Sequence, residues 1–92
     1  TTVDDLSIEY SEDGQVLVKQ LDKKVLTKGA WSTVMYKFQD WNKTKEEYDP
    51  QKFTIRRYQK RNGEYFQKSK FNISSVAQAQ SIIDALQEWI AE

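Results

Sequence analysis

Basic and aromatic residues alternate along one stretch of the chain, from Lys52 to Ile73. Residues 52–70 include seven Lys or Arg and a single acid, Glu64. Cations of this kind neutralise phosphates, and rings between them stack on unpaired bases, with about 1–3 kcal/mol per base. The side chains expected to do this chemistry are Arg56, Tyr58, Lys60, Phe66, Lys68 and Lys70. The alternative is an ordinary solvated sheet face, since lysines on strands also prevent edge-to-edge aggregation.

The same stretch is predicted to form two strands joined by a turn at residues 61–63, because Asn-Gly between strand-like runs is a strong hairpin signal. A two-residue and a three-residue loop remain to be distinguished, and a shift of one residue turns every side chain to the other face. The three-residue loop is predicted, because it separates an apolar row from a basic row. In that register one face holds Phe53, Ile55, Arg57, Gln59, Phe71, Ser69, Gln67 and Tyr65, and the other holds Thr54, Arg56, Tyr58, Lys60, Lys70, Lys68, Phe66 and Glu64.

One helix is predicted after this hairpin, beginning at Ser74-Ser75 and running to the end of the sequence. Ser75 and Gln78 have the spacing of a capping box. Apolar residues recur at helical spacing and form a wide stripe. The stripe would ordinarily cover the sheet, but it is wider than one small sheet needs, so a homodimer across a two-fold axis is expected. The residues expected at that dimer interface are Ile82, Ile83, Leu86, Trp89 and Ile90.

The first 27 residues are predicted to be an acidic hairpin or extension, separate from a single domain at residues 28–92. Residues 1–13 carry five acids and no base. Leu6, Ile8 and Tyr10 alternate with polar residues, which predicts a short strand, and Asp13-Gly14 predicts a turn into a second strand. Two interpretations stay open: a peripheral hairpin, or an acidic segment that lies over the basic face until nucleic acid displaces it.

The segment between these parts contains another strand, from Trp31 to Trp41, because β-branched and aromatic residues dominate it. Both faces of this strand are partly apolar, so both are expected to meet something. A mixed-charge connection follows at residues 42–51 and is predicted to be a loop or an extended two-stranded arm.

Composition excludes several classes of function. The 92 residues make one small domain, and the formal net charge is zero. The sequence has neither Cys nor His, which excludes disulfides, zinc sites of the usual kind and serine–histidine chemistry. The paired acids lie in turn-like stretches, so no enzyme activity and no cofactor are expected. Neither a membrane-spanning run nor a secretion signal is seen, and a cytoplasmic (nucleoid-associated) or nuclear location is expected.

Residues 53–89 resemble the C-terminal domain of the transcriptional coactivator positive cofactor four and its bacterial and phage relatives. The resemblance rests on an Ile-Arg-x-Tyr strand at residues 55–58, a turn at residues 62–64, a basic strand, and an Ile-Ser helix start at residues 73–74. It implies a four-stranded antiparallel sheet, a homodimer made through the helices, and paired grooves for single-stranded or melted DNA. Binding roles carry over to Arg56, Lys68, Lys70 and either Phe38 or Trp41. Where the family can place a tryptophan, this chain has Gln59.

The fold expected is therefore α+β: an antiparallel sheet of four strands or slightly more, one C-terminal helix, and two copies per molecule. The function expected is sequence-independent binding of single-stranded DNA, in transcription, replication or repair. Lys28 and Tyr36 complete the predicted interface. The alternatives are a protein–protein interaction module that uses the basic face, or an RNA-binding protein.

Overall fold

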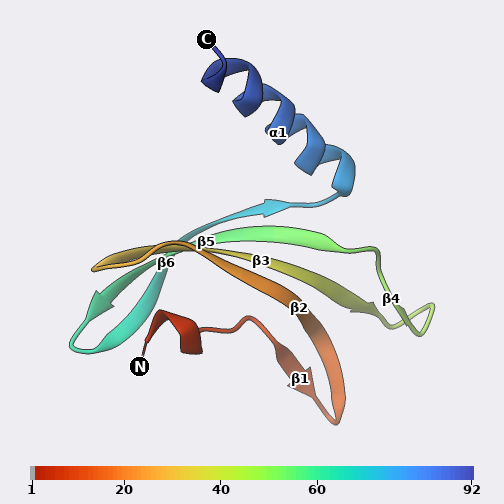
Figure 1. The fold of residues 1–92 in the computed structure, drawn as a ribbon. Coiled ribbons are helices and arrows are strands. Elements are labelled where there is room, and N and C mark those ends of the chain that lie inside the picture. The colour runs from red at the N-terminus through yellow and green to blue at the C-terminus, as the bar shows by residue number, and fades with distance from the viewer. Residues whose placement is uncertain (1) are drawn as a thin grey trace.

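A curled antiparallel sheet and one C-terminal helix make up the structure, a computed structural model that describes residues 2–92 (Figure 1). The sheet has six strands in the order β1-β2-β3-β5-β6, and β4 pairs with the end of β3. The predicted α+β class is confirmed, and the sheet has six strands where four or slightly more were expected. The elements are η1 (Val3–Asp5), β1 (Tyr10–Glu12), β2 (Gln15–Thr27), β3 (Trp31–Asn42), β4 (Glu47–Tyr48), β5 (Lys52–Arg61), β6 (Glu64–Ile73) and α1 (Val76–Ile90).

Strand β3 lies at the centre of the sheet and alternates between a buried face and a half-exposed face. Its buried side chains are Ser32, Val34, Tyr36 and Phe38. We call the face that carries them the inner face of the sheet and the opposite one the outer face. Strand β2 pairs along most of β3, so the first 27 residues contribute to the same sheet as the rest of the chain.

The N-terminal segment, residues 2–9, lies across the inner face and supplies the other half of the core. Val3 is buried against Val34, Tyr36 and Tyr58, with Leu6 and Ile8 packed beside them. Residues 6–9 are not a strand, so the prediction of a strand that starts near Leu6 was wrong. The apolar alternation there serves packing across the sheet rather than pairing within it.

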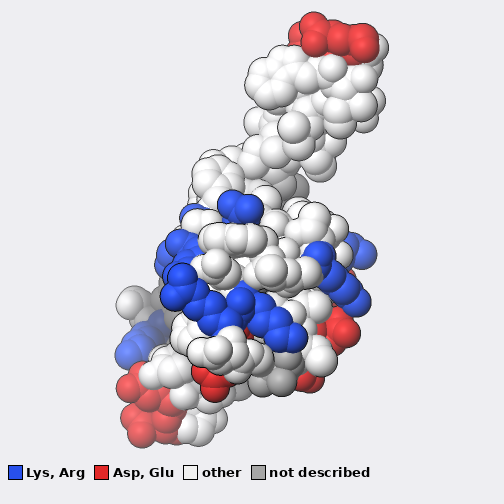
Figure 2. Space-filling model, turned by 90° about the vertical axis from the view of Figure 1, so that its left-hand side faces the viewer, with Lys and Arg blue, Asp and Glu red and all other residues white. Residues whose placement is uncertain are grey.

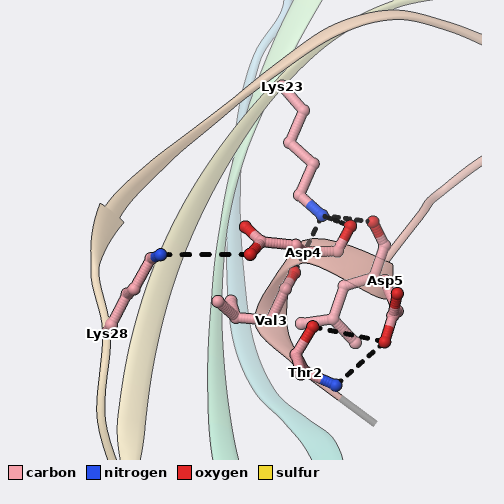
Figure 3. A network of polar contacts seen from close by, with 7 residues as sticks. Thr2, Val3, Asp4, Asp5, Lys23 and Lys28 are labelled. Carbon is pink, nitrogen blue, oxygen red and sulfur yellow. Dashed lines mark hydrogen bonds and ion pairs between the residues drawn. The ribbon is translucent and has the colours of Figure 1, made fainter.

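One lysine holds this segment in place. The Nζ of Lys23, on β2, donates hydrogen bonds to the carbonyl oxygens of Val3, Asp4 and Leu6 at 2.8, 2.9 and 2.7 Å (Figure 3). Asp4 also pairs with Lys28 at 4.0 Å. The N-terminal segment is therefore held more closely by its carbonyl oxygens, which contact Lys23, than by its carboxylates.

The β5–β6 hairpin has a two-residue turn, so the predicted three-residue loop was wrong. Arg61 pairs with Glu64, and both Asn62 and Gly63 have positive φ, at 51° and 78°. These values are the ones that a type I′ turn requires. The turn puts Tyr58 opposite Gln67, and it puts Phe66 opposite Gln59. Phe66 therefore lies on the outer face, whereas the prediction placed it on the same face as Arg56 and Tyr58.

A β-bulge at Lys68 then changes the register. Tyr58 pairs with Gln67, but Arg57 pairs with Ser69, so Lys68 is the extra residue on β6. Beyond the bulge, Ile55 lies opposite Phe71, and Arg56 lies opposite Lys70. The faces predicted for this half are correct, although each residue's partner differs from the predicted one by two positions. The inserted Lys68 explains both the correct faces and the changed partners. The tight turn shifts the pairing by one residue, which exchanges the two faces of β6, and the extra residue shifts it by one more, which exchanges them back.

The connection between β3 and β5 folds into a short arm, one of the two predicted forms. Trp41 pairs with Tyr48 of β4, and their rings meet edge-to-face at 5.0 Å between centroids. The arm lies at the end of β3 that is remote from Trp31.

Helix α1 begins at the predicted cap. The Ser75 hydroxyl accepts a hydrogen bond from the backbone N–H of Gln78, and the Gln78 side chain accepts from the backbone N–H of Ser74. The helix leaves the end of β6 on the side of the sheet opposite the N-terminal segment and points away from the strands (Figure 1). Its apolar stripe therefore does not cover the chain's own sheet. None of the helices among residues 2–92 is long and apolar enough to span a membrane.

Candidate nucleic-acid interface

Basic side chains gather where the β2–β3 turn meets the β5–β6 turn. The backbone N–H of Lys60 donates to the carbonyl oxygen of Ala30 at 2.7 Å and ties the two turns together. Figure 2 looks onto this end of the molecule and shows a band of Lys and Arg across it, with acids at the margin of the band and at the far ends of the molecule. We call these exposed residues the basic end: Lys28, Arg57, Lys60, Arg61, Lys68 and Lys70.

Most of these cations have no acidic partner. Within residues 2–92, only two ion pairs have a nitrogen–oxygen distance of 4.0 Å or less, Lys28–Asp4 and Lys52–Asp40. The other five cations of the basic end are left free to attract an anion. A surface of one sign raises the local concentration of a polyanion even when the whole protein is neutral.

Three aromatic rings lie among these cations. The Arg57 guanidinium stacks over the Trp31 ring at 4.4 Å from its centroid, and the Lys60 ammonium lies 5.5 Å from the Tyr65 centroid. Trp31 and Phe66 keep 41% and 46% of their surface exposed. A basic end with accessible rings has both chemical parts of a site for unpaired nucleotides.

Sequence reasoning did not include Trp31, Arg57, Arg61 or Tyr65 in the site. Trp31 opens β3 and pairs directly with Gln59 of β5. The sequence did indicate that Trp31 begins a strand, since the predicted strand started there. Only the register of β3 against β5 places its ring next to Arg57, and no local pattern determines that register.

Arg56 lies on the inner face and is half-buried. Its Nη1 donates to Gln67 Oε1 at 2.9 Å, and its Nε is buried without a hydrogen-bond partner. A buried donor without a partner costs about 1–3 kcal/mol. Because this Nε is closed to solvent, only the rest of the half-buried guanidinium can meet an anion.

Other predicted binding residues belong to the core. Tyr36 and Tyr58 are buried, and their hydroxyl groups share a hydrogen bond of 3.1 Å. Burial, and then the bond to Tyr58, raise the pKa of Tyr36 above its ordinary value. Phe38 is buried as well. All three rings are therefore buried, and the N-terminal segment packs over Tyr36 and Tyr58.

The structure thus brings together part of the predicted set. Arg56, Lys60, Phe66, Lys68, Lys70 and Lys28 lie in the half of the sheet next to the two turns. Trp41 does not join them, because ten residues of extended strand, about 33 Å, separate it from Trp31. The predicted dimer residues Ile83, Leu86, Trp89 and Ile90 are exposed, and Ile82 is half-buried.

Comparison with known proteins found no matching family model, no matching curated protein and no matching solved structure. Across residues 2–92, no group of three or more Asp or Glu side chains is placed to hold a metal ion. What the basic end binds is therefore inferred from its own side chains.

Proposed function

We propose that this protein binds single-stranded DNA, with little sequence preference, through the basic end of its sheet. The observation that carries the proposal is the set of exposed rings among cations that lack acidic partners. Unpaired strands offer both a phosphate chain and free base faces, whereas a duplex hides its base faces in the stack. The resemblance of residues 53–89 to the positive cofactor four family supports the same function.

The residues divide into two roles in this proposal. Trp31 and Phe66 stack on bases, and this is sequence-tolerant because every base has a π-face. Phosphates are neutralised by the basic end, with Arg56 as a further anion ligand. Trp31 lies across from Gln59, so it supplies an indole where the family's own tryptophan is missing.

The active form in this proposal is a homodimer. The exposed stripe of α1 is the feature that favours it, because solvent-exposed apolar patches on soluble proteins mark association surfaces. Two copies would present two basic ends to one strand or to both strands of a melted duplex. Such a protein would act in transcription, replication or repair.

Fluorescence anisotropy tests the proposal, with a labelled single strand of about 20 nucleotides, the matching duplex, and an RNA of the same sequence. Affinity for the DNA strand should exceed affinity for the duplex and fall with salt. For single strands the logarithmic salt slope is about −0.7 per phosphate neutralised. RNA bound as tightly as DNA would instead make the site a general single-strand site.

A charge-matched pair of variants locates the site. Lys68→Gln with Lys70→Gln removes two cations of the basic end, and the slope should become shallower by about 1.4. Lys43→Gln with Lys45→Gln removes two exposed cations in the turn before β4 and should leave the slope unchanged. If DNA affinity is absent at low salt, the basic end is better explained as a docking surface for an acidic protein.

A further inference from the structure

Among residues 2–92, most of the apolar stripe of α1 has no partner. Val76, Ile83, Leu86, Trp89 and Ile90 keep between 48% and 76% of their surface exposed. The radius of gyration is 15.2 Å, against about 12 Å for a compact domain of this length. The helix that projects from the sheet accounts for this open shape (Figure 1).

A second uncovered apolar surface lies on the outer face of the sheet. Cross-strand pairing places Met35, Ile55 and Phe71 in one row across β3, β5 and β6, and Phe53 lies beside that row. We call these four residues the outer floor. Phe71 is 52% exposed. Met35 and Phe53 also line a hollow of about 190 Å³, with three lysines and Asp22 among its other lining residues.

The two surfaces match in length and charge. Fifteen helical residues extend about 22 Å, enough to cross the three strands of the outer floor with room to spare. The stripe carries no charge that contact would desolvate, because Asp84 and Glu88 lie on the other side of the helix. The helix has no base, whereas Lys24 and Lys37 flank the outer floor and outnumber the one acid beside them, Asp22.

We infer that the occupant of the outer floor is α1 of a second copy, with each helix laid across the other chain's sheet. The inference specifies the homodimer of the proposed function and does not depend on DNA binding. An exchange of this kind is isologous, so each chain contributes one helix and one floor. The N-terminal segment covers the opposite face and does not obstruct it.

The area agrees with a stable dimer. With roughly 100 Å² for an aliphatic and 200 Å² for an aromatic side chain, the exposed parts of the stripe and of Phe71 amount to about 500 Å². The two-fold exchange doubles this to about 1,000 Å². Interface cores are about 65% apolar, which corresponds to a total near 1,500 Å², and standard stable interfaces bury about 1,600 Å².

Engineered cysteines test the exchange directly, because the natural chain has no cysteine. One cysteine is placed on the floor, Met35→Cys, and one on the helix, Leu86→Cys, and oxidised protein is run on a non-reducing gel. The double variant should form dimers linked between copies, far more than either single variant. Efficient linkage by Leu86→Cys alone would indicate helix-to-helix packing and overturn the inference. A disulfide within one chain would also overturn it.

Light scattering on unmodified and substituted protein provides the second test. The natural chain should have the mass of two copies, and both Leu86→Glu and Phe71→Ser should reduce it to one. Ala77→Glu, on the opposite side of α1, should remain dimeric. A monomeric natural chain, or a dimer indifferent to Phe71→Ser, refutes the exchange. DNA is absent from both assays, so the two ideas fail separately. A monomer that binds DNA contradicts the exchange and the dimeric form but leaves the proposed DNA site standing, and a dimer that binds none contradicts only the proposed DNA binding.

Discussion

Replacing Trp31 with alanine should weaken single-strand binding without changing its dependence on salt. Arg57 covers one face of the Trp31 ring at 4.4 Å, so one base at most can stack on the remaining face. One base contributes about 1–3 kcal/mol, and each 1.4 kcal/mol is a factor of ten. The dissociation constant should therefore rise about 5- to 150-fold. No charge is removed, so the logarithmic salt slope should stay the same.

The matched control for this prediction is Trp41→Ala, on the same strand and at the opposite end. Its ring meets Tyr48 edge-to-face at 5.0 Å, so its loss affects the arm rather than the basic end. Anisotropy titrations at two salt concentrations compare both variants with the natural chain, and thermal melts confirm that each is folded. If Trp31→Ala binds as the natural chain does, or if Trp41→Ala loses as much affinity, the stacking role of Trp31 is refuted.

Three further predictions concern stability. Because the pKa of Tyr36 is raised, the unfolded chain loses this proton near pH 10 while the folded chain keeps it, so the free energy of unfolding should fall as pH rises above about 10. Tyr36→Phe should make that fall shallower in urea titrations between pH 9 and 11; an unchanged slope contradicts the assignment. Ser75→Ala should cost about 1 kcal/mol of helix stability, seen as lower helical circular dichroism, and Ser81→Ala should cost less. Gly63→Ala should lower the free energy of unfolding by about 1–2 kcal/mol in chemical denaturation. The cost comes from the positive φ alone, because no atom lies within 4 Å of the added Cβ. Gly63→Asn should cost less, and an equal loss of stability in both variants would argue against a backbone origin.

The elements that the sequence predicted well are those determined by neighbours along the chain. Asn62-Gly63 placed the hairpin turn, although its predicted length was one residue too long, and Ser75 placed the helix start. Both signals are local, because a turn's φ values and a helix cap involve residues only a few positions apart. The long central strand from Trp31 was also found, since β-branched and aromatic residues dominate it.

The features that the sequence missed depend on pairs of distant segments. The bulge at Lys68 forms no contact that the neighbouring residues would predict. It allows the two-residue turn to coexist with the side-chain packing at the other end of the hairpin. The position of Val3 across the inner face requires contacts with β3 and β5. Tyr36 and Tyr58 were expected at the binding surface. The apolar faces of β3 indicated that something covers them, but not which segment does so.

The bulge at Lys68 also has a consequence for insertions and deletions in this gene. In a regular strand, losing one residue turns every later side chain to the opposite face. Losing Lys68 would instead remove the residue that the ladder does not use, and Gln67 and Ser69 would become neighbours opposite Tyr58 and Arg57, their present partners. Among the positions of β6, this one should therefore tolerate a single-codon deletion best, and its side chain is free to be selected for charge without regard to sheet pairing.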